Sequence, residues 1–453
     1  MQNLPRTPSR ESPTMPGGGG GGGAGDVVRP PTQARGRRRR QATSLPLDVI
    51  AEIAARSDLA TVVRCAATCR DVRGRVADPA FSHGGLLRLR RTGRFVLPLL
   101  RGHFVERYYY NGSDRKDELY LVDTTGAADA TRLIRASGGV ASRPAAAGGK
   151  NFSRLEPLSS RDGLLLVRKY YEQPNRKELC VCDPATGRSQ TLPPELNFPD
   201  AYDKVRYVLL AGDGEDGGAG TVGRRFHVIK AHLVAFHYLP RRRYLQVQTF
   251  SSEHGEWGPY TKIPARQLQQ YCTLPENHLV LAGVVHWLCG RSVLKLHGRE
   301  ARVTTTTLPA SFPDPERPWP IRRLLAVSAD GNLLVLVADD EKISAWEQSR
   351  HTAIWRPRPW VVIENEEILR FNNVVGLIER RSTSPVTIHL KWFAERSGAV
   401  LIGTYEYGFF WLDLRSMKIV RWFLDPKINS GTVHCPLEWG LSSWVPTFSC
   451  TTL

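Results

Sequence analysis

Residues 160–167 read Ser-Arg-Asp-Gly-Leu-Leu-Leu-Val, and residues 328–335 read Ser-Ala-Asp-Gly-Asn-Leu-Leu-Val. In both segments an Asp-Gly pair, which is a strong turn signal, precedes a run of aliphatic residues of strand length. Each segment therefore predicts a turn followed by a buried β-strand. The two segments begin 168 residues apart, at residues 160 and 328. An echo at this distance indicates that the chain repeats one supersecondary unit several times.

The chain from about residue 86 onward has the same texture of short apolar segments separated by Gly, Pro, Asp and Asn. Residues 243–250 alternate Leu, Val and Thr with Gln, and residues 408–412 and 418–423 flank a turn and predict a hairpin. No long segment of helical period is expected to interrupt the strands. About six clusters of strands can be counted, which leaves the number of blades open within the usual range of four to eight. The echo spans three or four blades at roughly 40–50 residues per blade. This pattern favours one closed β architecture, a β-propeller, over several sandwiches.

The tryptophans fit the same architecture. All 11 of them follow Glu256 in the sequence, and several lie near the ends of predicted strands. Those near strand ends are Trp287, Trp346, Trp392, Trp411 and Trp422. We expect them to pack between sheets, and the alternative is an aromatic patch that binds a peptide.

Residues 1–44 differ from the rest of the chain. They contain many prolines, seven consecutive glycines at residues 17–23 and a basic run at residues 35–40. Such a segment cannot bury enough apolar surface to offset its ordering entropy, so it is expected to be a disordered tail. The basic run is either a nuclear-import signal or a solvated linker. The tail holds eight arginines and contributes to a net charge of +18, but the other basic residues are scattered. We therefore expect weak polyanion affinity and no dedicated nucleic-acid domain.

Residues 45–85 predict three short helices. Ser44 can cap the first helix, Pro46 fits its first turn, and Asp48 lies at the positive end of its dipole. The apolar residues of the second helix recur at helical spacing and are Leu59, Val62, Val63, Ala66 and Cys69. A third helix is expected to end at residues 78–79, which are Asp-Pro. So small a unit has little core of its own, and part of its apolar surface should contact a partner or the next domain.

The first part of this helical unit carries a resemblance to a known motif. From residue 45 it reads Leu-Pro-x-Asp-Val-Ile-x-x-Ile-x-x-Arg, and from residue 62 it reads Val-x-Arg-Cys-x-x-x-Cys-Arg. This pattern resembles the F-box, and Asp-Pro-Ala-Phe at residues 78–81 is similar to the segment that closes the F-box in grass-type plant members. The chain has Ser57-Asp58 where the family usually has Leu-Pro, and Val72 where the family usually has Trp.

The resemblance implies an adaptor-binding surface. The side chains that would face a Skp-type adaptor, and through it a cullin, are Leu45, Pro46, Val49, Ile50, Ile53, Val62, Cys65 and Cys69. A helical groove accepts amphipathic helices with aliphatic anchors, which is the physical reason for these residue types. The alternative is that they only pack the module on its own C-terminal domain. Residues 179–188, Leu-Cys-Val-Cys-Asp-Pro-Ala-Thr-Gly-Arg, followed by Leu-Pro-Pro, are also similar to a strand and turn of F-box-associated β-propellers of plants.

The sequence offers little catalytic chemistry. It contains no Gly-x-Ser-x-Gly elbow, no P-loop and no His-Glu-x-x-His motif. His227, His232 and His237 are five residues apart, so on a strand they alternate between faces and do not converge on one metal. The segment 254–256, His-Gly-Glu, is expected to be a polar loop. We expect no catalytic residue, no metal and no other cofactor.

The cysteines and the charged loops have modest interpretations. Eight cysteines form no C-x-x-C pair, so structural zinc is not expected and the thiols should be reduced and buried. Asp213, Glu215 and Asp216 lie in a Gly-rich stretch that lacks the EF-hand pattern and predicts a mobile insertion. The run Arg-Arg-Arg at residues 241–243 predicts an exposed turn, with a contact to an acidic peptide as the alternative.

These observations predict a multidomain α+β chain. It would have a disordered tail at 1–44, a three-helix F-box module at 45–85 and an all-β, propeller-like domain at 86–453. No segment has the roughly 20 apolar residues of a membrane helix, and the N-terminus lacks a signal-peptide pattern. We therefore expect no membrane partner and a location in the nucleus, the cytoplasm or both.

The leading functional hypothesis is a non-enzymatic substrate receptor of a Skp–cullin–F-box ubiquitin ligase, which brings an unknown target protein to the ligase. The alternatives are a propeller interaction protein without a ligase, an enzyme with its site in the central channel, and a basic nuclear protein associated with nucleic acid.

Overall fold

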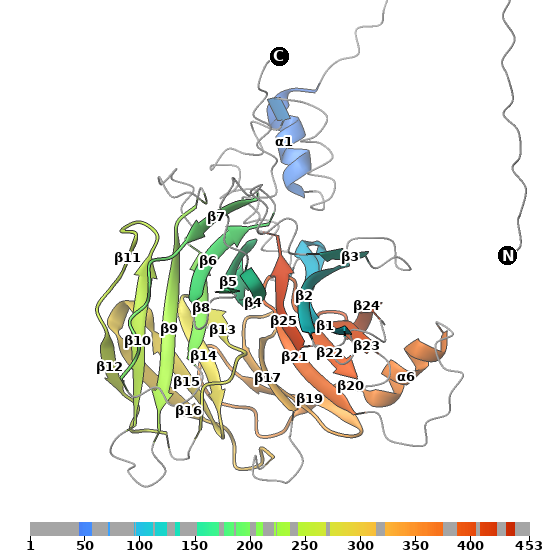
Figure 1. The fold of residues 1–453 in the computed structure, drawn as a ribbon. Coiled ribbons are helices and arrows are strands. Elements are labelled where there is room, and N and C mark those ends of the chain that lie inside the picture. Colours follow the sequence, from blue (N-terminus) through green and yellow to red (C-terminus); the bar gives the residue numbers. More distant parts are fainter. Residues whose placement is uncertain are drawn as a thin grey trace, which may run out of the picture. The chain divides into compact units, whose positions relative to one another are not determined.

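Figure 1 shows the computed structural model of the chain. It describes residues 45–56, 71–72, 95, 97–111, 114–124, 132–135, 152–171, 176–184, 187–199, 205–211, 222, 224–235, 243–268, 272–313, 322–374, 387–404, 408–423 and 432–439. The predicted tail at 1–44 lies outside the described residues. So do the predicted second and third helices, apart from residues 71–72, which are helical. None of the described helices is long and apolar enough to cross a membrane.

Six antiparallel sheets form the β region, and each is called a blade below. Blade 1 has the strand order β25 (Thr432–Glu438), β1 (Leu100–Asn111), β2 (Asp114–Asp123) and β3 (Arg132–Arg135). Blade 2 consists of β4 (Phe152–Arg161), β5 (Leu164–Tyr171), β6 (Lys177–Asp183) and β7 (Arg188–Thr191). Blade 3 consists of β8 (Arg206–Ala211), β9 (Phe226–Val234) and β10 (Tyr244–Ser251), and β10 also pairs with β11 (Glu256–Trp257) and β12 (Thr261–Pro264).

The other three blades are plain four-stranded meanders. Blade 4 consists of β13 (Leu279–Leu281), β14 (Val284–Cys289), β15 (Ser292–His297) and β16 (Arg302–Thr307). Blade 5 consists of β17 (Arg322–Val327), β18 (Leu333–Ala338), β19 (Lys342–Gln348) and β20 (Trp360–Glu364). Blade 6 consists of β21 (Ile388–Ala394), β22 (Ala399–Thr404), β23 (Gly408–Asp413) and β24 (Lys418–Phe423).

The blades form a six-blade propeller-like arrangement whose first strands lie at its centre. Strand β25 contacts β4, β4 contacts β8, β17 contacts β21, and β21 contacts β25. The ring is closed by a strand from the other end of the chain, because β25 pairs with β1 from Leu100↔Glu438 to Glu106↔Thr432. In Figure 1 the red strand β25 lies against β1. This exchange removes an open sheet edge and ties the two ends of the β region together.

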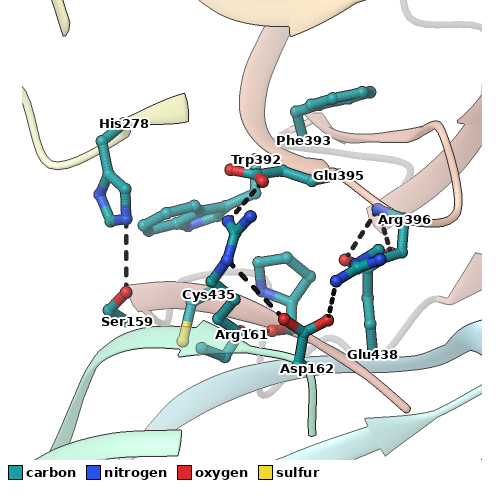
Figure 2. Close-up of a pocket in the computed structure, with 12 residues that line it drawn as sticks. Ser159, Arg161, Asp162, His278, Trp392, Phe393, Glu395, Arg396, Cys435 and Glu438 are labelled. Atoms are coloured by element: carbon teal, nitrogen blue, oxygen red, sulfur yellow. Dashed lines mark hydrogen bonds and ion pairs between the residues drawn. The ribbon is translucent and has the colours of Figure 1, made fainter. Parts of the chain in front are cut away.

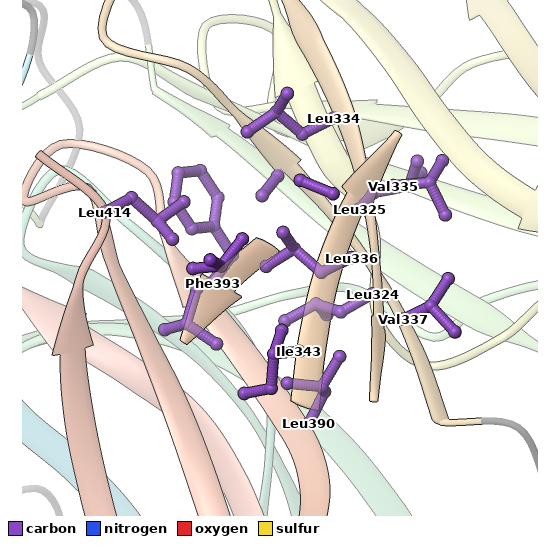
Figure 3. Close-up of a cluster of buried hydrophobic side chains, with 14 of the residues drawn as sticks. Leu324, Leu325, Leu334, Val335, Leu336, Val337, Ile343, Leu390, Phe393 and Leu414 are labelled. Carbon is purple, nitrogen blue, oxygen red and sulfur yellow. The ribbon is translucent and has the colours of Figure 1, made fainter. Parts of the chain in front are cut away.

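The apolar core lies between neighbouring blades. Leu324, Leu336 and Ile343 of blade 5 pack with Leu390 and Phe393 of blade 6 in one buried cluster (Figure 3). Other clusters join blades 2 and 3, blades 3 and 4, and blades 6 and 1. The tryptophans belong to these cores as predicted: Trp287, Trp346 and Trp411 are buried, and Trp392 and Trp422 are half-buried.

The Asp-Gly echo marks equivalent hairpins, and the structure confirms the six blades and the propeller-like arrangement. Asp162 and Gly163 connect β4 to β5, and both have positive φ angles of 51° and 81°. This is the conformation that a two-residue hairpin turn requires and that Asp-Gly supplies. Gly331, with φ of 85°, lies in the connection from β17 to β18. The echo therefore relates the first hairpins of blades 2 and 5, which are three blades apart.

Two helices of ten residues each are described. Helix α1 (Leu47–Arg56) confirms the first predicted helix, and its first turn is tied by the amides of Val49 and Ile50 to the Pro46 carbonyl at 3.0 and 3.1 Å. Helix α6 (Asn365–Val374) follows β20 and is a helix of ten residues that the sequence did not predict, where only the absence of a long helical segment was expected. Its buried side is narrow, because Ile368 is buried and Phe371 is half-buried while its acidic residues are exposed. Two short 3-10 turns complete the described elements, η1 (Leu97–Leu99) and η3 (Gly298–Glu300).

Candidate functional site

A polar pocket lies where the first strands of blades 2, 6 and 1 end. The hollow has a volume of about 430 Å³ when its open mouth is included. It is lined by Ser159, Ser160, Arg161, Asp162, His278, Trp392, Phe393, Glu395, Arg396, Cys435, Pro436 and Glu438. Strand β4, the turn after β21 and the end of β25 supply most of these residues, and His278 comes from the residue before β13. Because four blades contribute, the pocket exists only in the closed propeller.

Alternating charges line one side of this pocket. Arg161 Nη1 lies 2.6 Å from Glu395 Oε2, and Arg396 Nη2 lies 2.6 Å from Asp162 Oδ1 (Figure 2). Glu395 also accepts a hydrogen bond from the Val280 amide at 2.8 Å. Burial opposes the charge of Arg161, but the neighbouring carboxylates raise the pKa of its guanidinium above its ordinary value. The four side chains therefore link blade 2 to blade 6 as a charged but overall neutral network.

Glu438 holds the turn that carries part of this network. Its carboxylate accepts hydrogen bonds from the amides of Arg396 and Ser397 and from the Ser397 hydroxyl, at 3.1, 2.7 and 2.6 Å. Burial raises the pKa of Glu438, although the hydrogen bonds favour its ionised form. Strand β25 thus fixes the connection between β21 and β22 in addition to closing the ring.

Ser159 and His278 face each other at the other end of the pocket. Ser159 Oγ lies 3.3 Å from His278 Nε2 and accepts a hydrogen bond from the Leu209 amide at 3.1 Å. Burial lowers the pKa of His278, which keeps the ring neutral at pH 7. Its other nitrogen faces the Glu276 carbonyl rather than a carboxylate, at 3.3 Å. A serine nucleophile needs an accessible Oγ and an oriented base, whereas Ser159 is only 1% exposed.

The remaining pocket groups suit binding rather than bond making. Trp392 lies edge-on to His278, with ring centroids 6.5 Å apart, and forms an apolar wall (Figure 2). Burial raises the pKa of the Cys435 thiol to about 12, so the thiol stays protonated. Within the described part of the chain, no group of His, Cys, Asp and Glu side chains could hold a metal ion. The pocket can accept polar groups of a ligand above an aromatic wall.

A second buried ion pair links blades 1 and 2. Glu106 is 1% exposed and receives two hydrogen bonds from the Arg154 guanidinium, at 2.6 and 2.9 Å. His434 Nε2 lies 3.5 Å from the same carboxylate. Burial acts against ionisation, but these two partners lower the pKa of Glu106 overall. The pair holds strands β1, β4 and β25 together near the starts of β4 and β25.

Five of the predicted adaptor-binding residues lie on helix α1 or immediately before it. Leu45, Pro46, Val49 and Ile53 are exposed, and Ile50 is half-buried. The predicted contacts Val62, Cys65 and Cys69 lie outside the described residues. Val72, which occupies the position where the resembling family usually has Trp, is only 4% exposed.

Other sequence predictions have mixed outcomes. His227 is exposed and His232 is buried, as expected for alternate faces of β9, and His254 lies in an exposed turn. His237 and the acidic stretch from Asp213 to Asp216 lie outside the described residues. The prediction that the arginines before residue 244 form an exposed turn was wrong for Arg243, which is 8% exposed. The reason is that Arg243 lies directly before β10 and donates to the carbonyl of Leu268, a buried residue of the cluster that joins blades 3 and 4.

From the sequence, Arg161 and Asp162 were expected only as parts of a turn, and the pocket was not predicted. The pocket brings together residues that are up to 279 positions apart, from Ser159 to Glu438. The one available signal was the pair of charges beside the Asp-Gly turn, and a turn of this kind is usually solvated.

Comparison with solved structures gives remote similarity. A prolyl endopeptidase is 10% identical, with a TM-score of 0.33, over 74% of this chain and 48% of that chain. Kuenenia stuttgartiensis hydrazine synthase is 9% identical, with a TM-score of 0.40, over 76% and 47%. TolB from Acinetobacter baumannii is 7% identical, with a TM-score of 0.31, over 72% and 66%. This chain spans about half the length of the first two.

Comparison of the chain with known protein families identifies one family. No curated protein matches the chain. Residues 136–432 match the family described as a domain of unknown function, DUF7595. That span begins after β3 and ends at the first residue of β25, so it covers blades 2 to 6. The chain therefore belongs to the DUF7595 family.

Proposed function

We propose that this chain is the substrate-recognition subunit of a Skp–cullin–F-box type ubiquitin ligase. Helix α1 and the residues that follow it would bind a Skp-type adaptor, and the propeller would bind a target protein. The chain would need no catalytic residue of its own. It would act by holding lysines of the target near a charged conjugating enzyme, which raises their effective concentration.

The exposed apolar face of α1 is the observation that carries this proposal. Val49 and Ile53 are four residues apart in α1 and are 42% and 51% exposed, and Leu45, which precedes the helix, is 56% exposed. Residues four apart lie on the same side of a helix. Leu47 adds a further exposed aliphatic side chain at the start of the helix, at 38%. An aliphatic row of this kind is the recognition element of a helix that docks in a groove.

The helix also has the features that a rigid anchor needs. Pro46 fixes the backbone immediately before α1, and its carbonyl accepts the first hydrogen bonds of the helix. The residue before a proline is restricted to extended conformations, which limits the backbone freedom of Leu45. Anchors that are held in place lose less entropy on binding, which favours a central binding role for Leu45.

The propeller fits the target-binding half of the proposal. Its fold is consistent with a protein-interaction domain, and its central pocket combines Arg161, Asp162, Glu395 and Arg396 with the Trp392 wall. Groups of both signs beside an aromatic surface can recognise a peptide by charge complementarity and stacking. The target itself is to be identified by experiment.

Co-purification of the full chain with a Skp-type adaptor tests the proposal. We expect a stoichiometric complex with the unchanged chain and loss of the complex with the double variant Leu45→Ala/Pro46→Ala. Ile354→Ala is the matched control, because Ile354 is 68% exposed but lies in the connection between β19 and β20. Separate elution of the unchanged chain and the adaptor would overturn the ligase proposal and leave a propeller interaction protein. Equal binding by the double variant would overturn the role of α1.

A further inference from the structure

Blade 2 carries a row of two cations and a tyrosine across three neighbouring strands. In the register of the sheet, Arg154 of β4 lies opposite Tyr170 of β5, and Tyr170 lies opposite Lys177 of β6. Side chains that are directly opposite each other point to the same face of a sheet. The guanidinium carbon of Arg154 and Nζ of Lys177 each lie 5.6 Å from the centroid of the Tyr170 ring. The tyrosine therefore has a cation on either side of it along the row, within the range of cation–π attraction.

Carboxylates fix two members of this row. The Tyr170 hydroxyl donates a hydrogen bond to Glu156 Oε2 at 2.5 Å, and the Arg154 guanidinium donates two hydrogen bonds to Glu106. The Arg154 side chain is nevertheless 35% exposed. Groups that are already held in place lose less entropy when a partner binds, so Arg154 and Tyr170 are preorganised for a contact.

Lys177 adds a charge that the chain does not compensate. It is exposed at the first residue of β6, and no carboxylate of the described residues pairs with it. Positive charge predominates around this end of the β5–β6 hairpin, and a surface of this kind attracts a negatively charged partner. The basic side chains are Arg154, Arg168, Lys169, Arg176 and Lys177, and the acidic ones are Glu106, Glu156 and Glu178.

The geometry of the row favours a peptide over a nucleic acid. Cations of the chain already lie over the Tyr170 ring, which disfavours the stacking of a base on it. Arg154 and Lys177 are two strands apart, which is about 10 Å. A polyproline II helix rises about 3.1 Å per residue and turns once in three residues, so side chains three residues apart project from one side about 9 Å apart. Two acidic residues at this spacing match the two cations.

We propose that the row of Arg154, Tyr170 and Lys177 is a docking surface for an acidic peptide segment of a partner protein. Lys177 and Arg154 each contact one carboxylate of the segment, and Tyr170 positions the two cations between them. The row shares no residue with the central pocket, and Arg154 lies toward the opposite end of β4 from Arg161. It is a second binding surface of the propeller, and it depends neither on α1 nor on an adaptor.

Fluorescence anisotropy of the full-length chain with a labelled peptide tests the proposal. The probe repeats the unit Glu-Pro-Pro, which forms a polyproline II helix with its glutamates on one side, and the reference peptide repeats Gln-Pro-Pro. We expect the Glu-Pro-Pro peptide to bind, with an affinity that falls as the salt concentration rises, and the reference peptide to bind much more weakly. Equal affinity for the two peptides would overturn the proposal. Tighter binding of a single-stranded oligothymidine of the same net charge would also overturn it.

A charge reversal at Lys177 tests the location of the surface. Lys177→Glu should weaken the binding of the Glu-Pro-Pro peptide by about fivefold or more, because a repulsive charge replaces one of the two cations. Lys418→Glu is the matched control, since Lys418 is also exposed at the first residue of a strand, β24 of blade 6, and it should bind the peptide as the unchanged chain does. Equal affinities of these two variants, with unchanged midpoints of urea unfolding, would overturn the proposal.

The double variant Leu45→Ala/Pro46→Ala separates this proposal from the ligase proposal. It should bind the Glu-Pro-Pro peptide as tightly as the unchanged chain, because the row lies in blade 2 and the substitutions lie at α1. Loss of peptide binding in this variant would overturn the assignment of the peptide to the row.

Discussion

His103 lies in the core between blades 1 and 6. The side chain is fully buried, and its ring meets the rings of Phe409 and Trp411 edge-on, with centroids 5.5 and 5.7 Å apart. Among the residues that the structure describes, neither ring nitrogen has a hydrogen-bond partner. Burial lowers the pKa of His103 to about 3, because a charged imidazole cannot be solvated there.

This environment predicts a stability that depends on pH. Above pH 6.5 the ring is neutral in both the folded and the unfolded chain. Between pH 6.5 and about 3 only the unfolded chain takes up a proton, so the free energy of unfolding falls as the pH falls. Each such histidine lowers it by about 1.4 kcal/mol per pH unit. His286, whose pKa burial lowers to about 4, adds to the slope over a narrower range.

Urea unfolding at several pH values between 7.5 and 4.5 measures this effect. His103→Phe should reduce the slope of unfolding free energy against pH by the contribution of one histidine, about 1.4 kcal/mol per unit. Substitution of His254, which is exposed in the turn after β10, is the control and should leave the slope as it is. An unchanged slope in His103→Phe would show that His103 is not the group that titrates on unfolding.

Gly398 occupies a position that only glycine fits. Its φ angle is 69°, and a Cβ atom there would overlap the ring of Phe95. Gly187 has a similar φ of 70° but open space around the Cβ position. Gly187→Ala should therefore cost on the order of 1 kcal/mol from backbone strain alone. Gly398→Ala should cost about 3 kcal/mol or more, because Phe95 must move as well. Equal losses in thermal or urea unfolding would contradict the packing of Phe95 on this turn.

At the scale of elements, local signals predicted strands and turns well. The Asp-Gly turn at residues 162–163 and the hairpin of β23 and β24 lie where the residue types placed them, because turn chemistry depends on a few neighbouring residues. Helix α6 was missed, since it is short and polar residues predominate in it, and Ile368 is the only apolar residue with a described side chain in it that is buried. Arg243 was placed on the surface because the sequence gives no sign that its guanidinium is buried and bonded to the Leu268 carbonyl, 25 residues later.

Strand β25 is the element on which ring closure depends. It pairs with β1 and caps the β21–β22 turn through Glu438. Leu437 on this strand is 2% exposed and packs with Phe104 and Leu155. Leu437→Asp should lower the free energy of unfolding by about 4 kcal/mol or more, because a carboxylate would be buried without a partner.

Val361→Asp is the control for this change. Val361 is apolar but 49% exposed on β20, the last strand of blade 5. We expect its midpoint of urea unfolding to shift little, whereas Leu437→Asp should shift the midpoint strongly. Similar midpoints for the two variants would mean that the closing strand contributes no more than an outer strand.

At the scale of the whole molecule, the propeller-like arrangement was predictable but the pocket was not. The strand clusters and the spacing of the echo indicate a propeller of about six blades, within the usual range of four to eight. The pocket depends on which ends of β4, β21 and β25 meet, and it includes His278 from the connection before β13. Which strand ends lie together is set by the closure of the ring and by the path of the long connection before β13. Neither leaves a recognisable pattern of neighbouring residues in the sequence. The match to the DUF7595 family covers blades 2 to 6.

In the proposed function, separate surfaces of the molecule bind separate partners. The exposed aliphatic row on α1 would serve the adaptor, and the charged pocket of the propeller would serve the target. Each surface can be tested without disturbing the other, because the substitutions of Leu45 and Pro46 lie outside the propeller core.

Hydrogen–deuterium exchange of the full-length chain, with and without a Skp-type adaptor, is the most direct test of the central claim. We expect slower amide exchange in peptides that cover residues 45–56 when the adaptor is present, and unchanged exchange in the strands of the blades. Loss of that protection in Leu45→Ala/Pro46→Ala would tie it to the exposed row on α1. Unchanged exchange in residues 45–56 at saturating adaptor, or protection confined to the propeller, would contradict adaptor binding by α1.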